Sequence, residues 1–291
     1  MMDGFLLINK EDNISSNKID NIIKRTLGIS KVGHLGTLDP LAKGLLVVMV
    51  GTSTKYAKYF DDLTKSYILE VRLGATSKSL DYETELEKKV DCDYRGKEDL
   101  IDDIINNYPR VYNQTPPIYS AIKTSGKKYY EMANKNIAFE PKKRDVTIYD
   151  IKRISNITYE DNNSFFMLVC HVSKGFYVRS LAREIGEKLN IPSMASLIIR
   201  EKVGDFDLKD AYTMSDIENN NFKLLSPLDY LSFNSITLDD EMVFKVLNGA
   251  KLSPKFFSGD EYYIIKKKSG ENIAIYKRSD SCYRMDLLIK R

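Results

Sequence analysis

The sequence predicts a mixed α+β fold that ends in a small β-rich domain. Two observations predict it: strand-like and helix-like patterns are interspersed through the first part of the chain, and short segments broken by glycine and proline follow from about residue 232. The 291 residues, 43% of them hydrophobic, are enough for a sizeable core and a second domain. We therefore expect one domain at residues 1–231 and another at residues 232–291.

The N-terminal elements are predicted from apolar runs and helix-capping residues. Residues 5–8 are an apolar run typical of a buried strand, and Ser15 or Ser16 can cap a helix that Gly28 ends. Residues 33–44 contain three glycines and a proline without periodicity, which predicts a loop before an apolar strand at 45–50. A loop between rigid elements is a usual place for chemistry.

The central and C-terminal elements follow from the same patterns. Residues 67–73 alternate between apolar and polar faces, with Tyr67 first on the apolar face, which predicts a sheet strand. A near-continuous apolar strand is predicted at 164–172, and after a turn at 173–175 a helix is predicted at 178–189. Shorter patterns predict a helix near 100–105 and strands at 262–265 and 272–276.

Charge is distributed unevenly along the chain, although the formal net charge is only +3. Residues 123–144 contain seven basic side chains and two acidic ones, whereas residues 81–103 contain ten acidic side chains and four basic ones. The basic segment can attract a polyanion and the acidic segment repels one. Most charge runs are simply solvated surface, so this pattern alone does not identify a nucleic-acid partner.

Composition excludes several classes of protein. The three cysteines are scattered, which disfavours a disulfide framework or a zinc knuckle, and two histidines, His34 and His171, are too few for a His-rich metal site. The longest apolar run, residues 45–50, is far shorter than the roughly 20 residues of a membrane span, and the first residues lack a basic signal-peptide region. We expect a cytoplasmic protein with no membrane association and no bound metal.

Four motifs carry most of the functional information. The loop GHLGTLDPLAKG (residues 33–44) resembles the catalytic motif of the TruB family of tRNA pseudouridine synthases. The family's other motifs are matched by Tyr67 at the start of its strand, by PPIYSAIK (residues 116–123) and by SKGFYVR (residues 173–179), in the family's order. Any one of these would be a weak signal, but four in order over about residues 4–230 are specific.

The resemblance implies a fold, a reaction and a set of site residues. The fold is a pseudouridine-synthase-like, largely antiparallel sheet flanked by helices, followed by a PUA-like domain that FKVLNG (residues 244–249) resembles loosely. The reaction converts uridine 55 in the T-loop of tRNA to its C-glycoside isomer and uses no cofactor. Catalysis is assigned by resemblance to Asp39 as nucleophile, Tyr67 against the target base and Arg179 paired with the aspartate.

Further residues are assigned to the RNA by the same resemblance. His34 corresponds to the histidine associated with turning the uridine out of its stack, a step that costs a few kcal/mol. Lys10 and Tyr177 correspond to substrate contacts or pocket support, and Asp81 to a tRNA contact. The family's inserted, RNA-clamping element corresponds to the basic region at about 123–150, where phosphates would meet Lys123, Lys127 and Lys128.

The chemistry explains why these residue types are needed. Breaking an N-glycosidic bond and rejoining the base through carbon requires a nucleophile, a shielded pocket and proton transfer. Burial in a pocket that holds a displaced base would raise the pKa of a carboxyl group by up to about 3–5 pH units, which a neighbouring arginine opposes. An aspartate nucleophile therefore needs a permanent cation such as Arg179, and the ring of Tyr67 can stack on the base.

Two other functions are compatible with parts of the sequence. One is a tRNA-binding folding factor whose catalysis is dispensable or lost, suggested by the basic segment and by Lys78, which replaces the family's first aspartate in the loop at 74–81. The other is a guide-RNA-dependent synthase, disfavoured because the chain lacks the long C-terminal RNA-binding region of those proteins. We expect a monomer that binds the T-arm of tRNA and needs no obligate protein partner.

Overall fold

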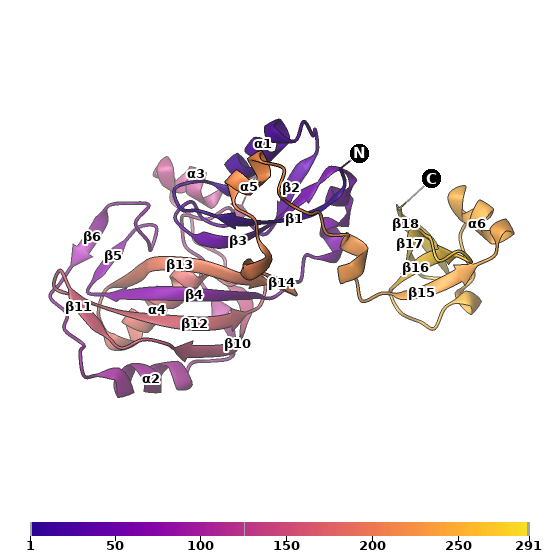
Figure 1. Cartoon of the computed structure of the whole chain (residues 1–291). Coiled ribbons are helices and arrows are strands. Elements are labelled where there is room, and N and C mark those ends of the chain that lie inside the picture. The colour runs from indigo at the N-terminus through magenta and orange to yellow at the C-terminus, as the bar shows by residue number, and fades with distance from the viewer. Residues whose placement is uncertain (1, 125, 290–291) are drawn as a thin grey trace. The chain divides into compact units, whose positions relative to one another are not determined.

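The computed structural model describes residues 2–124 and 126–289 (Figure 1). The chain divides into two compact units, Met1–Pro227 and Leu228–Arg291, each with its own hydrophobic core. The division falls a few residues before the boundary predicted at 231. No helix within the described residues is long and apolar enough to cross a membrane.

The first unit is built on a ten-stranded sheet (Figure 1). Every neighbouring pair along its main path is antiparallel except the parallel pair β13 and β3, so the predicted α+β class with a largely antiparallel sheet is confirmed. The strands along the path are β1 (Gly4–Lys10), β3 (Lys43–Val50), β13 (Ser193–Val203), β4 (Lys65–Leu73), β12 (Asn163–Val172), β10 (Arg144–Arg153) and β7 (Val111–Gln114). Three short strands pair with members of that path: β2 (Val32–Leu35), β11 (Thr158–Glu160) and β14 (Phe206–Asp207).

Two helices of this unit have ends that the sequence explains. The helix α1 (Ser16–Thr26) is capped by Ser15, whose hydroxyl accepts a hydrogen bond from the Lys18 N–H, as predicted. The helix α4 (Val178–Leu189) matches its predicted bounds and ends at Asn190 in the left-handed conformation that asparagine tolerates. The remaining helices and helical turns are α2 (Glu98–Asn106), α3 (Tyr129–Asn134), α5 (Met214–Glu218), η1 (Gly51–Tyr59), η2 (Leu208–Asp210) and η3 (Pro227–Tyr230).

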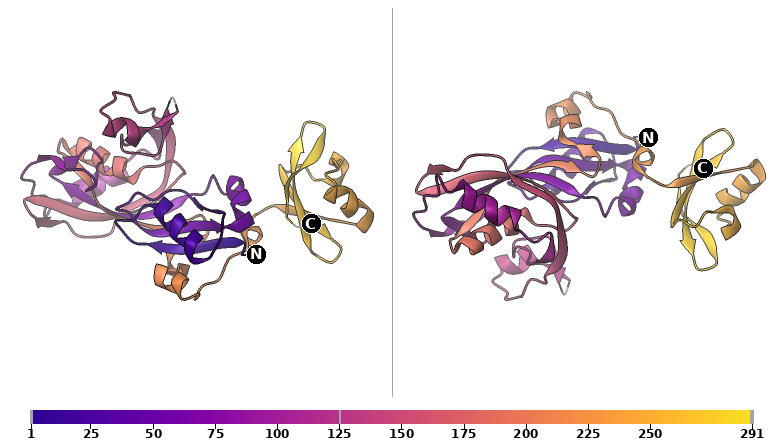
Figure 2. Two further views of the ribbon diagram at one scale, coloured as in Figure 1. Left: turned by 90° about the horizontal axis from the view of Figure 1, so that it is seen from above. Right: turned by 90° about the horizontal axis from the view of Figure 1, so that it is seen from below.

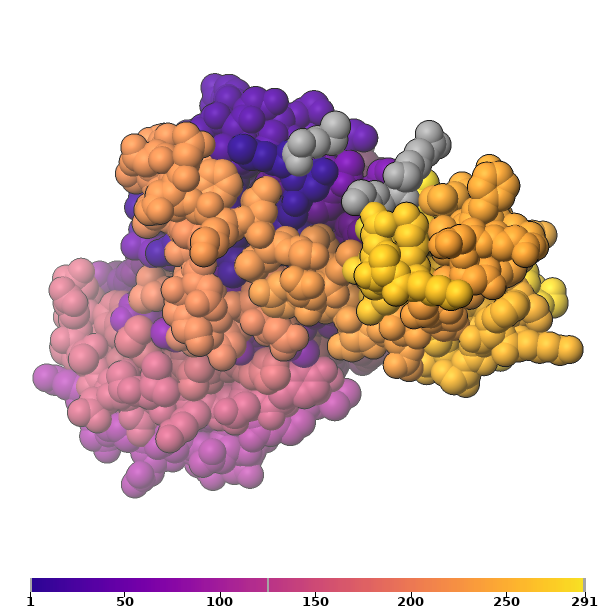
Figure 3. All heavy atoms as spheres, turned by 45° about the vertical axis from the view of Figure 1, so that its right-hand side comes forward, coloured from indigo at the N-terminus to yellow at the C-terminus, as the bar shows by residue number. Residues whose placement is uncertain are grey.

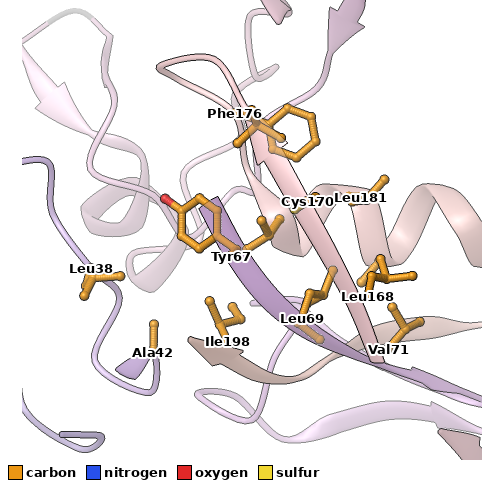
Figure 4. Close-up of a cluster of buried hydrophobic side chains, with 14 of the residues drawn as sticks. Leu38, Ala42, Tyr67, Leu69, Val71, Leu168, Cys170, Phe176, Leu181 and Ile198 are labelled. Atoms are coloured by element: carbon orange, nitrogen blue, oxygen red, sulfur yellow. The ribbon is translucent and has the colours of Figure 1, made fainter. Parts of the chain in front are cut away.

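The core lies between one face of the sheet and α4 (Figure 4). Tyr67, Leu69 and Val71 alternate along β4 and are all buried on this face, as the sequence pattern predicts. Leu168 of β12 and Leu181 of α4 belong to the same cluster and are both fully buried. Tyr67 therefore stands at the end of a rigid strand that is packed along its length.

The structure corrects the loop predicted at 33–44. Its first residues belong to the strand β2, which pairs with β3 so that Gly33 faces Met49 and His34 faces Val48. The glycine there is tolerated because ladder hydrogen bonds hold the backbone, and the irregular path begins only at Gly36, which has φ +76°. The strand β13 and the long strand β10 were not predicted at all.

The end of the first unit returns to its beginning. Phe5 and Leu225 exchange two backbone hydrogen bonds of 2.8 Å, and Tyr212 donates its N–H to the carbonyl of Leu7. Figure 3 shows this segment, drawn in orange, lying against the indigo N-terminal residues. The return ties β1, which precedes the motif loop, to residues about 200 positions later.

Two two-stranded sheets lie outside the main sheet. The strand β5 (Ala75–Ser77) pairs with β6 (Leu86–Lys89), which lies in the acidic segment at 81–103, and β8 (Lys123–Thr124) pairs with β9 (Lys127–Lys128) at the start of the basic segment. Ser125, within the predicted insertion at 123–150, lies outside the described residues. The last residues of that predicted insertion, from Arg144, belong to β10 of the main sheet.

The second unit is a small sheet with one helix (Figure 2). The predicted strands at 262–265 and 272–276 lie within two of its four strands, and its core contains Val246 and Tyr276. The elements are β15 (Asn234–Leu238), α6 (Asp240–Leu247), η4 (Pro254–Phe256), β16 (Tyr262–Lys267), β17 (Asn272–Ser279) and β18 (Cys282–Leu288). This matches the predicted β-rich character of the C-terminal region.

Candidate active site

Asp39 lies on the irregular segment between β2 and β3, in a turn that the Ala42 N–H closes by donating to the Asp39 carbonyl. Its side chain is 34% exposed, so one side of the carboxylate is open to an incoming group. Its Oδ2 atom lies 2.8 Å from Nη2 of Arg179. The structure therefore brings together two predicted catalytic residues that are 140 positions apart in the chain.

Arg179 is buried at the second position of α4, with 1% of its surface exposed. Its Nη1 donates to the Ser79 carbonyl at 2.7 Å and its Nη2 to the Tyr119 carbonyl at 2.9 Å. Burial opposes the charge on this guanidinium, but the Asp39 and Asp81 carboxylates outweigh it and raise the pKa of Arg179. The arginine therefore remains a cation whose direction is set by fixed carbonyls.

Asp81 occupies the other side of the same guanidinium. Its Oδ2 lies 3.4 Å from Nη1 of Arg179 and has no hydrogen-bond partner, while its Oδ1 accepts from the Glu83 N–H at 2.9 Å. Only 4% of Asp81 is exposed. Asp81 lies beside Arg179 and supports it, because the loop at 77–84 folds inward over this residue, and the expected tRNA contact of Asp81 stays a prediction.

Tyr67 is buried beside this pair, with 9% of its surface exposed. Its ring lies among apolar side chains that include Leu38 and Ile198, and its hydroxyl end points out of the cluster (Figure 4). Burial raises the pKa of Tyr67, which keeps the phenol protonated. The buried guanidinium of Arg200 interacts with its hydroxyl, so the side chain has a polar partner.

Arg200 is a site residue that the sequence reasoning missed. It is 1% exposed, and it donates from Nε to the Leu45 carbonyl at 2.8 Å and from Nη2 to the Gly36 carbonyl at 2.9 Å. It thus connects the motif loop, β3 and Tyr67. Arg200 directly follows the apolar residues Leu197, Ile198 and Ile199, and a charged residue next to such a run could have indicated a buried arginine. An arginine is rarely buried without partners.

His34 is held through both ring nitrogens. Nδ1 lies 2.8 Å from Oδ2 of Asp20, which is on α1, and Nε2 lies 3.1 Å from the Thr37 hydroxyl. Its side chain is 10% exposed. The sequence did not predict Asp20 as a partner, but its position on α1 is what sets the orientation of the imidazole.

Lys10 supports the motif loop through a hydrogen bond to the Pro40 carbonyl. It is fully buried, and its Nζ donates to the carbonyls of Glu11, Ile14 and Pro40 at 2.7–3.0 Å. Burial lowers its pKa to about 8. Of the two predicted roles, pocket support agrees with this geometry, whereas a direct substrate contact does not, because all three donated hydrogen bonds end on backbone carbonyls.

Tyr177 is the N-cap residue of α4, and the side-chain amide of Gln114 forms hydrogen bonds with both its backbone N–H and its backbone carbonyl. The Gln114 Oε1 accepts from the Tyr177 N–H at 2.8 Å, and its Nε2 donates to the Tyr177 carbonyl at 3.2 Å and to the Tyr112 hydroxyl at 3.0 Å. Tyr112 in turn donates to Oε2 of Glu184 on the same helix. This network fixes the first turn of α4, which carries Arg179, and sequence reasoning did not find it.

The predicted RNA-contacting lysines lie apart from these contacts. Lys123 and Lys127 are exposed on the small β8–β9 sheet, and Lys128 is half-buried beside the Tyr130 ring. Within the described residues, no group of histidine, cysteine or acidic side chains is arranged to hold a metal ion. The site thus consists of one half-open carboxylate, two buried arginines and a buried tyrosine.

The fold and the site together define a class of enzyme. Two solved structures superpose over nearly the whole chain: one of a Cbf5–Nop10–Gar1 complex (TM-score 0.67, 20% identity, 96% of this chain and 79% of that chain), and one of an H/ACA RNP bound to a substrate RNA containing 2'-deoxyuridine (TM-score 0.69, 18% identity, 99% and 85%). At these identities the likeness concerns the fold. The class follows when the pseudouridylate synthase family model that matches residues 24–178 is added: the fold, with an aspartate paired to a buried arginine, is that of a pseudouridine synthase.

Sequence comparison gives the family. The model of the TruB family pseudouridylate synthase N-terminal domain matches residues 24–178. The chain is 34% identical to a tRNA pseudouridine synthase B of Clostridium kluyveri over 98% of both chains, and 33% identical to that of Halalkalibacterium halodurans over 96% and 94%. A tRNA pseudouridine synthase B of Staphylococcus aureus is 34% identical over 95% and 94%. The chain belongs to the TruB family, as its motifs indicated.

Proposed function

We propose that this TruB-family enzyme isomerises uridine 55 in the T-loop of tRNA to pseudouridine, with Asp39 as its nucleophile. The observation that carries the proposal is the 2.8 Å pair between Asp39 and the buried Arg179, on the motif that the family shares. The relatives named above are called tRNA pseudouridine synthases, which supports tRNA as the substrate.

The reaction can be divided among three residues. Asp39 attacks the nucleoside as the N-glycosidic bond breaks, and the base then rejoins the ribose through C5 as the bond to Asp39 is broken and the carboxylate is released. The base loses a proton from C5 and gains one at N1, so the substrate and product have the same composition and no redox cofactor is needed. Arg179 places a buried, permanent positive charge 2.8 Å from the carboxylate, whose other side is open to the nucleoside.

Tyr67 supplies a surface for the base. Its ring belongs to the buried apolar cluster beside Asp39. Stacking of a base on an aromatic ring contributes about 1–3 kcal/mol. The guanidinium of Arg200 interacts with the hydroxyl oxygen, and the phenolic proton can be donated to a neighbouring acceptor. His34, oriented by Asp20, is assigned to displacing the uridine from its stack.

The decisive experiment replaces the nucleophile. Asp39→Asn keeps the shape of the side chain but removes its negative charge, so we expect the T-arm stem-loop to bind and no pseudouridine to form. Product is measured by chemical mapping of pseudouridine, and binding by filter retention. Asp99→Asn, an exposed carboxylate on α2, is the matched control and should remain fully active. Turnover by Asp39→Asn would contradict the mechanism.

The RNA-folding activity considered above is not favoured, because Asp39, Tyr67 and Arg179 are all in place. It predicts that pseudouridine 55 persists in tRNA from cells lacking the gene, whereas our proposal predicts its loss. We also propose that the enzyme acts in the cytoplasm as a monomer without an obligate protein partner. Light scattering of the purified enzyme, alone and with tRNA, measures its stoichiometry.

A further inference from the structure

A cavity of about 480 Å³ lies beside the motif loop and is not used by the mechanism above. We call it the basic cavity. It is lined by residues from separate parts of the chain, among them His34 and Gly36 of the motif, Lys65 at the start of β4, and Arg144 at the start of β10. Because it shares His34 with the proposed uridine site, the nucleotides next to the target come close to it.

The lining of the basic cavity is strongly cationic. Four basic side chains and a single carboxylate, that of Asp61, contribute to it. They converge from η1, β4, β10 and the turn at 173–175, so the charge is concentrated by the tertiary fold and is not a run in the sequence. A hollow lined by one sign of charge attracts the opposite sign.

Among the described residues, Arg144 has a guanidinium N–H group that is still free to donate a hydrogen bond. Its Nε is buried without a hydrogen-bond partner, and none of the ion pairs formed within the described residues involves it. Its guanidinium lies 5.9 Å from the centre of the Tyr177 ring. Gly175 leaves room for it, since a Cβ at that position would lie 3.2 Å from Nη1. An arginine fork with a free edge suits bidentate recognition of an oxyanion.

The two lysines nearest to Arg144 differ in their partners. Lys174 is paired with Asp61 at 3.1 Å and with Asp62, so much of its charge is already neutralised. Lys65 donates only to the Leu63 carbonyl, at 2.6 Å, and burial together with Arg200 lowers its pKa to about 8. Asp61 and Asp62 act on Lys65 only at a distance and do not form an ion pair with it within the described residues, so this partly desolvated ammonium gains from an anion placed beside it.

We propose that the basic cavity binds a phosphodiester group of the RNA strand next to the displaced uridine, with Arg144 as its forked donor and Lys65 as a second cation. The assignment rests on the proposed function, because a strand whose base is turned toward Asp39 presents a phosphate on either side of that nucleotide. Contacts of this kind fix the register of the RNA and carry little sequence information.

The test is the salt dependence of T-arm binding, measured in the Asp39→Asn background so that turnover plays no part. Arg144→Met should weaken binding about tenfold near 0.1 M salt, since a hydrogen bond to a charged group is lost. The slope of log K against log salt should become shallower by about 0.7, the value for one phosphate contact on a single strand. Arg144→Lys should recover part of the affinity and the slope.

The matched control is Lys152→Met, which removes a charge from an exposed position on the same strand. It should leave both the affinity and the slope close to those of the parent. If Arg144→Met behaves like Lys152→Met, the basic cavity does not bind phosphate and the proposal is overturned. If the parent itself has no affinity for the T-arm, the proposed function fails instead, so the two failures are distinguishable.

A second arm identifies the source of the phosphate. T-arm stem-loops carrying one uncharged methylphosphonate linkage are tested at each position flanking the target uridine. One linkage should weaken binding to the parent and have no further effect on Arg144→Met, because both changes remove the same contact. If no linkage shows this coupling while inorganic phosphate competes with the RNA, the cavity binds free phosphate and the assignment to the RNA strand is wrong.

Discussion

The Asp39–Arg179 centre and the basic segment at 123–144 both use basic side chains, but they are built differently. In the centre, Arg179 is 1% exposed and directed by two carbonyls and two carboxylates. In the basic segment, Lys123 and Lys127 are exposed on two-residue strands. The first region fixes the direction of one cation, whereas the second provides charge density.

This difference predicts that the centre controls the rate of the chemical step and that the basic segment controls the affinity for tRNA. A buried, directed cation acts on the charge of the nucleophile and is expected to affect the chemical step. Exposed lysines act on the phosphate backbone, so they are expected to change binding in a manner that salt screens. The three predictions below test this separation, beginning with the largest effect.

Arg179→Lys should lower kcat about a hundredfold and leave tRNA affinity within a few-fold of the parent, because one ammonium cannot replace a fork with four partners. Single-turnover kinetics with saturating enzyme give the chemical rate. Arg183→Lys, one turn further along α4 and partly exposed, is the control and should retain nearly full activity. A variant Arg179→Lys with normal kcat would show that the guanidinium geometry is unimportant.

Gln114→Glu should lower kcat about tenfold with little change in KM, since the loss of two donated hydrogen bonds shifts the first turn of α4. The introduced carboxyl would face the Tyr177 carbonyl and lie near Glu184, which raises its pKa in the folded state. The stability deficit should therefore be small below about pH 4 and grow as pH rises above the unfolded-state pKa of about 4.3.

The measurement for Gln114→Glu is urea unfolding between pH 4 and pH 8, together with steady-state kinetics. Asn113→Asp, the neighbouring exposed residue, changes the same chemical group outside the network and serves as the control. Equal effects of the two substitutions would argue against a positioning role for Gln114.

Replacing Lys127 and Lys128 together by methionine should weaken tRNA binding only several-fold and leave the single-turnover rate unchanged. The loss should disappear at high salt, because these side chains act through screened charge. Lys88 and Lys89, two exposed lysines on β6, provide the matched double substitution and should have no effect. A lower rate of chemistry at saturating enzyme would mean that the segment also positions the uridine.

Much of the architecture could be predicted because it depends on local physics. The cap at Ser15, the bounds of α4 and the apolar face that includes Tyr67 follow from capping groups and residue periodicity. The loop prediction failed for residues 33–35, since the pairing of β2 with β3 depends on a partner strand and not on local preference. The long strands β10 and β13 were missed for a related reason: their burial alternates irregularly along a strongly bulged ladder.

By itself, the sequence determined the identity of the central residues, because a motif records which side chains are present. It supplied Asp39, Tyr67 and Arg179, and it indicated why an aspartate needs an arginine. Only the tertiary structure decided how they are held: Arg200 donates to the Gly36 carbonyl 164 positions away, Gln114 bonds to the backbone of Tyr177, and Asp81 is buried beside Arg179. Backbone carbonyls and amides belong to every residue, so contacts with them leave no signature in the sequence.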